Sequence, residues 1–425
     1  MNTTLPITQT LHHHRRRMGG RDPHQVHRAA TPLELLFDLT FVISFGAAAN
    51  QFAHALAEGH YNTALLGFGF ASFAICWAWI NFSWFASAYD TDDWIFRLTT
   101  MVQMIGVIVL ANGLPRMFAS IEHGKHLDNS IIVLGYVIMR VAMLSQWLRA
   151  AKQDPARRRV CLTYAYAIII AQVGWIVQIF LDFSVAFSIV IALVLAAVEM
   201  AGPYLAERKD GGTPWHPHHI AERYSLFVII ALGEGVVGTV ATLSAVLEEH
   251  GWTMDAALVC MAGMGLTFGL WWVYYMLPSA HALHKHRERS FVWGYSQIVL
   301  IASIVATGAG LHVAAYFIEH KAHISALATV LTVAIPVGIF LVCIYALYYY
   351  LMQCFDRLHI WLLLGSALVV ALAIGAAIAG VNMAQCLVIL MFAPIVTVIG
   401  YEVQGHRNQA LALEKEEDRT AMMSE

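Results

Sequence analysis

The stretch TPLELLFDLTFVISFGAAANQ, from Thr31 to Gln51, decides the fold class of this chain. It is close to the length of about 20 mostly apolar residues that a helix needs to cross a bilayer. Similar runs recur along all 425 residues, of which 59% are hydrophobic and 12% are charged. A soluble protein carries roughly twice that charged fraction. The sequence therefore predicts an all-α, polytopic membrane helix bundle.

About 12 transmembrane helices can be counted from the apolar runs and the polar residues between them. We expect them at 33–57, 61–86, 94–119, 129–150, 158–181, 184–206, 219–246, 253–277, 291–317, 324–350, 358–380 and 383–403.

The charged connections orient these spans. Lys and Arg gather before span 1 and between spans 4 and 5, 6 and 7, and 8 and 9, at Arg15, Arg16, Arg17, Arg21, Arg28, Arg149, Lys152, Arg157, Arg158, Arg159, Arg208, Lys209, Lys285, Arg287 and Arg289. With an even number of spans these connections share one side, which is expected to be the cytoplasm. We therefore predict a bacterial inner-membrane protein with cytoplasmic tails at 1–30 and 406–425. Residues 1–28 lack the apolar core of a signal peptide and are expected to be mobile.

Two stretches that lie 188 residues apart (222 − 34) resemble each other, ELLFDLTFVISFGA from Glu34 and ERYSLFVIIALGEG from Glu222. The sequence around Trp77 likewise resembles that around Trp271. Six spans per half is an even number, so both halves would insert in the same direction. We predict a parallel duplication with repeats at 31–210 and 211–405. Chance likeness between apolar sequences is the alternative.

Two acids begin the first span. Thr31, Pro32 and Glu34 fit a capping box, with threonine before the helix and glutamate at its third residue. Asp38 follows one turn later on the same face of the helix. An unpaired carboxylate there is costly, so Asp38 is expected to face the bundle interior and find a partner. Two roles are equally open for Asp38, that of a buried structural hydrogen-bond acceptor and that of a functional group.

Glu234 lies 12 residues after Glu222, which is about 18 Å along a helix and near the middle of the membrane. An acid at that depth costs on the order of 3 kcal/mol on insertion scales. Arg140 is at mid-span in the fourth helix and stays charged, so it needs a carboxylate. We expect Arg140 to pair with Glu234 or Asp38. These three residues form the predicted site for a substrate, an ion or a proton, and a purely structural ion pair is the alternative.

Histidines gather in WHPHH (216, 218, 219) and HALHKH (281, 284, 286). Such clusters at one membrane face could hold a metal in an enzyme that acts on lipid. Neither cluster repeats an HxxxH spacing, and no P-loop, GxSxG or HExxH motif is present, so we expect no cofactor and no metal and lean away from an enzyme. No basic domain points to nucleic acid.

PLELLFDLTFV near the N-terminus, together with ERYSLFVIIALGEGVVG after mid-chain, resembles the bacterial low temperature requirement A (LtrA) family over residues 30–405. The resemblance implies a need for the protein during growth in the cold, and carries over no activity. It marks as signature positions Glu34, Phe37, Asp38, Glu222, Gly233 and Glu234. Over ten residues, LLFDLTFVIS is also similar to the first-helix FSD motif of a potassium-channel family built from six-span repeats.

A transporter or channel is the favoured prediction, because duplicated halves would enclose buried charge. Its partners would be the lipid bilayer and a small solute or ion, and self-association into a homo-oligomer is open. A lipid-acting enzyme with a histidine-bound metal and a non-catalytic membrane sensor are the alternatives.

Overall fold

The computed structural model of the chain describes residues 15–25, 28–124, 126–181, 183–354, 356–411 and 413–414. Every regular element in these ranges is a helix. Of the helices so described, 12 are long and apolar enough to cross a membrane. The predicted all-α membrane fold and its number of spans are confirmed.

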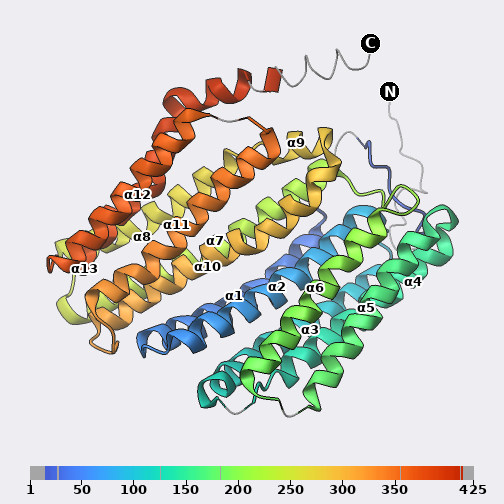
Figure 1. Ribbon diagram of the computed structural model, residues 1–425, viewed down its shortest axis with the longest axis horizontal. Helices are drawn as coiled ribbons and strands as arrows, with labels where there is room; N and C mark the ends of the chain where they lie inside the picture. The colour runs from blue at the N-terminus through green and yellow to red at the C-terminus, as the bar shows by residue number, and fades with distance from the viewer. Residues whose placement is uncertain are drawn as a thin grey trace, which may run out of the picture. The chain divides into compact units, whose positions relative to one another are not determined.

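The helices begin and end within a few residues of the expected limits. Figure 1 labels each of them. They are α1 (Pro32–Ala57), α2 (Tyr61–Tyr89), α3 (Trp94–His123), α4 (Ser130–Gln153), α5 (Arg158–Ile179), α6 (Val185–Glu207), α7 (Pro217–His250), α8 (Met254–Tyr275), α10 (Ser290–Ile318), α11 (Ala326–Met352), α12 (Arg357–Ile378) and α13 (Met383–Gly400). A short helix between spans, α9 (Ser279–Lys285), was not expected.

The first compact unit consists of Met1–Ala47 and Phe73–Arg223. Within it α3 packs on α4, α4 on α5, and α5 on α6. Small residues allow the closest crossing, because a Cβ atom added to Gly135 of α4 would lie 2.6 Å from the carbonyl oxygen of Gly106 in α3. Contact between apolar helices is no more favourable than contact with apolar lipid tails, so membrane helices associate through the close packing that small residues allow.

The second compact unit consists of Ala48–Ser72 and Tyr224–Glu425. Here α10 packs on α11, α11 on α12, α12 on α13, and α8 on α13. Most of α10 is buried, whereas α12 exposes a stripe of apolar side chains that includes Leu364, Leu368 and Leu372. A stripe of this kind is expected on a helix that faces lipid.

The order of neighbours α3–α4–α5–α6 in the first unit recurs as α10–α11–α12–α13 in the second. This recurrence agrees with the duplication, which stays a prediction together with its boundaries at 31–210 and 211–405. The compact units do not follow those boundaries, because α1 and α2 each contribute to both.

Of the N-terminal tail that was expected to be mobile, residues 15–25 contact the rest of the first unit, and residues 1–14 and 26–27 lie outside the described residues. The N–H of Arg16 donates to Asp93 Oδ2 at 3.0 Å, and the N–H of Met18 donates to Gln153 Oε1 at 2.6 Å. The Met18 side chain is buried. Sequence composition missed this because backbone N–H and C=O groups of the segment, which every sequence has, take part in most of these contacts. The predicted C-terminal tail begins as a helical extension to Leu411, and residues 415–425 lie outside the described residues.

Candidate functional site

The first candidate site lies at the start of α1, where Thr31 and Glu34 form the predicted capping box. The N–H of Thr31 donates to Glu34 Oε2 at 2.8 Å, and the N–H of Glu34 donates to Thr31 Oγ1 at 3.3 Å. Pro32 has no N–H that would need a partner there. The capping role of Glu34 is confirmed, although its side chain is fully buried and makes further contacts.

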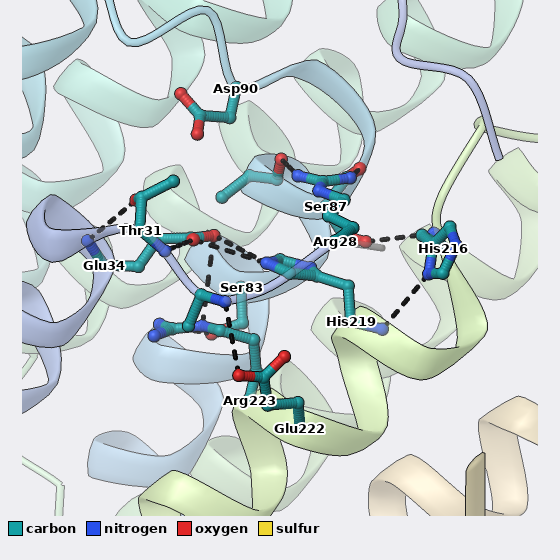
Figure 2. Close-up of polar contacts among 12 residues, drawn as sticks. Arg28, Thr31, Glu34, Ser83, Ser87, Asp90, His216, His219, Glu222 and Arg223 are labelled. Atoms are coloured by element: carbon teal, nitrogen blue, oxygen red, sulfur yellow. Dashed lines mark hydrogen bonds and ion pairs between the residues drawn. The ribbon is translucent and has the colours of Figure 1, made fainter. Parts of the chain in front are cut away.

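Two pairs of charged residues meet beside this cap. Glu34 and Asp38 are four residues apart on α1, and His219 and Arg223 are four residues apart on α7, so each pair lies on one face of its helix. His219 Nε2 lies 3.2 Å from Glu34 Oε1 (Figure 2). Arg223 donates from Nη1 and Nη2 to the two carboxylate oxygens of Asp38, each at 2.6 Å. We call these four residues the charge quartet. All four belong to the first compact unit.

The charge quartet is shielded from solvent, with each of its residues at most 1% exposed. Trp79 Nε1 donates to Asp38 Oδ1 at 2.7 Å, and Arg223 Nη2 donates to Ser83 Oγ at 3.4 Å. Both oxygens of Asp38 are therefore occupied, as in a structural ion pair. Sliding α1 along α7 would strand a buried charge, so the pair fixes their register. A binding role for Asp38 stays a prediction.

Arg28 and Asp90 lie next to the charge quartet, outside the membrane spans (Figure 2). Arg28 donates to the carbonyl oxygens of Ala86, at 2.7 Å, and of Ser87, near the end of α2. Burial, and secondly the positive charge of Arg21, lower the pKa of Arg28 to about 10. Burial, and secondly the negative charge of Glu34, raise the pKa of Asp90 to about 6. Asp90 is thus a buried carboxyl group that holds its proton more tightly than an exposed aspartate does.

Arg140 is part of a second buried network in the first compact unit. Its Nη2 donates to Glu199 Oε2 of α6 at 2.6 Å, and Trp175 Nε1 of α5 donates to Glu199 Oε1 at 2.8 Å. The expectation that Arg140 would pair with Glu234 or Asp38 is therefore wrong. Asp38 is already occupied by Arg223, while α6, which packs on α5, brings Glu199 within reach of Arg140. A binding role for Arg140 stays a prediction.

Sequence reasoning missed His219, Arg223 and Glu199 as partners. Glu199 carried a usable signal, since it stands in the apolar run VLAAVEMAG of the sixth span. Arg223 follows the signature residue Glu222, and its spacing from His219 matches that between Glu34 and Asp38. Nothing in a local pattern, however, says that these two helix starts meet.

Glu234 is a different kind of acid, in the second compact unit. Its residue is 4% exposed and lies within the span of α7. It has no hydrogen bond or ion pair with any residue that the structure describes. The backbone of Glu234 lies against Gly308 of α10, and Gly235 lies against Thr267 of α8. Gly233 borders open space. Glycines thus bring neighbouring helices close to an acid that has no charge partner within the described chain.

The other signature positions take part in packing and capping. Phe37 is buried and contacts the rings of Phe41 and Phe82, with centroids 5.1 Å and 3.8 Å away. Glu222 Oε1 accepts from the N–H of Ala30 at 3.4 Å, which ties α7 to the chain ahead of α1.

The histidine clusters are partly engaged in hydrogen bonds. His216 Nε2 lies 2.8 Å from the carbonyl oxygen of Gln25, and His216 Nδ1 accepts from the N–H of His219 at 3.2 Å. Within the described residues, no group of three or more His, Cys, Asp or Glu side chains is arranged to hold a metal ion.

Comparison with known proteins gives two findings. The family described as bacterial low temperature requirement A protein (LtrA) matches residues 29–394. An uncharacterized protein of Rhizobium meliloti (strain 1021) is 26% identical over 292 residues, which cover 65% of this chain and 67% of the relative. No solved structure matches.

Proposed function

This chain belongs to the bacterial low temperature requirement A family, whose name specifies no chemical activity, and we propose that it is a transporter or channel for a small solute or ion. The observation that carries the proposal is Glu234, a buried carboxyl group without a polar partner in the described chain. An ionisable residue inside a membrane helix that is not paired is expensive, and residues of this kind mark ion pathways and proton relays.

The comparison between the acids supports this assignment. Asp38 and Glu199 each face an arginine at 2.6 Å, so their charge is compensated in place. Glu234 must instead be protonated or meet a mobile cation, because burial disfavours an isolated carboxylate. A metal cation needs several oxygen ligands at once. With no second polar side chain bound to Glu234 in the described chain, a proton is the ion that fits best. The proposed activity is therefore proton-coupled or proton-conducting.

The test is flux in vesicles that contain the purified full-length protein. Proton, Na⁺ and K⁺ movements are followed with ion-sensitive dyes after a pH step or a salt gradient. Proton flux should exceed that of protein-free vesicles, and Glu234→Gln should reduce it to near that background. Gln keeps the size of the side chain and removes its ability to ionise.

Glu248→Gln is the matched control, since Glu248 is an exposed acid on the same helix. Its flux should equal that of the unmodified protein. Unchanged proton flux in Glu234→Gln would reject the role of Glu234. If the unmodified protein gives no more flux than protein-free vesicles under any of the gradients, transport of these three ions is rejected.

A further inference from the structure

A groove of about 420 Å³ lies on the second compact unit, between the loop-proximal parts of α1 and α2 and the helices α10 and α11. Phe52 and Phe68 form one side, with stacked rings 4.3 Å apart. Ala302 of α10 and Ile335 and Ile339 of α11 also line it. All four helices are membrane spans, so the groove opens where lipid tails are expected.

The rim of the groove faces outwards. Leu65 is 63% exposed and Ile335 is 56% exposed, whereas Phe52 and Phe68 are buried. The groove is therefore lined partly by buried aromatic rings and partly by exposed apolar side chains that can face the hydrocarbon layer.

Apart from the phenol of Tyr61 at one end, the lining offers little to a polar ligand. Ser303 Oγ donates to the carbonyl oxygen of Leu300 at 2.6 Å, and Thr332 Oγ1 donates to that of Thr329 at 2.7 Å. These hydroxyls line the groove, but their protons are used within their own helices. None of the described residues that line it is charged. Bound water needs two to four polar partners, so the groove is expected to exclude water and to hold hydrocarbon.

The dimensions fit one leaflet of a bilayer. From Ala328 to Ile339 the lining covers 11 residue-to-residue steps along α11 (339 − 328), or about 16 Å of helix. Half of a hydrocarbon core of about 30 Å is about 15 Å. Taking a methylene group as roughly as large as a water molecule, at roughly 30 Å³, the groove holds on the order of a dozen of them.

The end of the groove at Tyr61 lies beside a polar pair of loops. The N–H of His323, between α10 and α11, donates to the carbonyl oxygen of Ala57 at the end of α1, at 2.7 Å. His323 Nδ1 also lies 2.8 Å from Glu58 Oε2. Tyr61 lines the groove at this level. Aromatic and polar side chains of this kind are typical of headgroup depth.

We propose that this groove is a binding site for one acyl chain of a phospholipid, from the leaflet on the side of the α1–α2 loop. The headgroup would lie near Tyr61, Glu58 and His323, and the chain would run between Phe68 and Ile335 towards the middle of the membrane. This site is separate from Glu234 and does not depend on ion transport.

The experiment uses the full-length protein in vesicles of phosphatidylethanolamine and phosphatidylglycerol. A small fraction of the phosphatidylethanolamine carries a diazirine midway along one acyl chain. After irradiation, labelled peptides are mapped by mass spectrometry. Labelling in the groove should exceed, several-fold, that of the exposed stripe on α12 at Leu368 and Leu372.

Ala302→Phe fills the groove from α10 and should lower the groove labelling several-fold, while Ala371→Phe, at an exposed position of α12, should leave it unchanged. If Ala302→Phe aggregates, Ala306→Leu fills the same groove with a smaller side chain. Labelling in proportion to exposure alone would overturn the proposal. So would groove labelling that a well-folded filling variant does not reduce, or cross-links between two copies of the chain at the groove in place of lipid.

Discussion

At the scale of single residues, the buried acids of this chain have two kinds of surroundings. Asp38 and Glu199 each accept a hydrogen bond from an arginine at 2.6 Å, and each also accepts one from a tryptophan N–H. Glu234 has no such partner in the described chain. Because a fixed opposite charge offsets part of the desolvation cost, the paired acids can hold helices in place, whereas we propose that Glu234 changes its protonation state.

The pair between Arg223 and Asp38 gives a prediction about stability. Arg223→Ala should destabilise the protein by about 3–5 kcal/mol, because it leaves the carboxylate of Asp38 buried without its charge partner. Combining Arg223→Ala with Asp38→Asn should cost less than the sum of the two single changes. Thermal unfolding of the purified protein in detergent measures this. Arg97→Ala is the control, since Arg97 and Asp92 form a partly exposed pair that is worth at most about 1 kcal/mol.

A second pair of variants applies the same reasoning to Arg140. Arg140→Ala alone should strongly destabilise the protein, and the double variant with Glu199→Gln should be less destabilised than Arg140→Ala alone. For the double variant with Asp38→Asn, the two free-energy costs should simply add. Additive costs for Arg140 with Glu199 would contradict the contact between α4 and α6 through these side chains.

Asp90 gives a prediction about pH. Its folded-state pKa, about 6, is raised from the ordinary value of 3.8, so the folded protein holds the proton more tightly than the unfolded chain. The stabilisation from this group is fully present below about pH 4 and is lost as the pH rises through about 6. The whole change amounts to about 3 kcal/mol or less.

Asp90→Asn should therefore flatten the fall in thermal stability between pH 4 and pH 7, relative to the unmodified protein. Unfolding midpoints at several pH values measure the difference between the two proteins, so other titrating groups cancel. Asp210→Asn, at an exposed position, should leave the profile unchanged. An Asp90→Asn profile parallel to that of the unmodified protein would show that Asp90 does not titrate in this range.

At the scale of helices, close crossings depend on glycine as well as on apolar length. An added Cβ atom at Gly135 would lie 2.6 Å from backbone atoms of α3, which cannot move aside as a flexible side chain can. Gly135→Ala should thus destabilise the protein by about 1–3 kcal/mol, the usual cost of overpacking. Gly375→Ala in α12 is the control, since nothing lies within 4 Å of its added Cβ atom. Equal unfolding temperatures for the two variants would argue against the tight contact between α3 and α4.

At the scale of the whole molecule, an even number of spans and the Lys and Arg in alternate loops predict cytoplasmic termini. Reporter fusions after Gly211, between α6 and α7, and after Glu249, at the end of α7, check this orientation. The fusion at Gly211 should report the cytoplasm and the fusion at Glu249 the opposite side. The reverse result would invert the predicted topology. If both fusions report the same side, the assignment of α7 as a membrane span is wrong.

The sequence by itself determined the class of protein and the limits of its helices. Crossing a bilayer requires a long apolar segment and satisfied backbone groups, and both are properties of one stretch of chain. The capping box of Thr31 and Glu34 was predictable for the same reason, since its members are three residues apart. The costly exceptions Asp38, Arg140 and Glu234 were also visible, because a charged residue stands out in an apolar run.

Only the tertiary structure decided which charge meets which. Several acids and cations occur in the spans, and the choice between them depends on which helices lie side by side, a relation between segments far apart in the chain. Asp38 therefore contacts Arg223, which is 185 residues away, and Arg140 contacts Glu199 instead of Glu234. The tertiary structure also leaves Glu234 without a partner in the described chain. This depends on where the side chains of neighbouring helices lie, and no local sequence pattern contains that information.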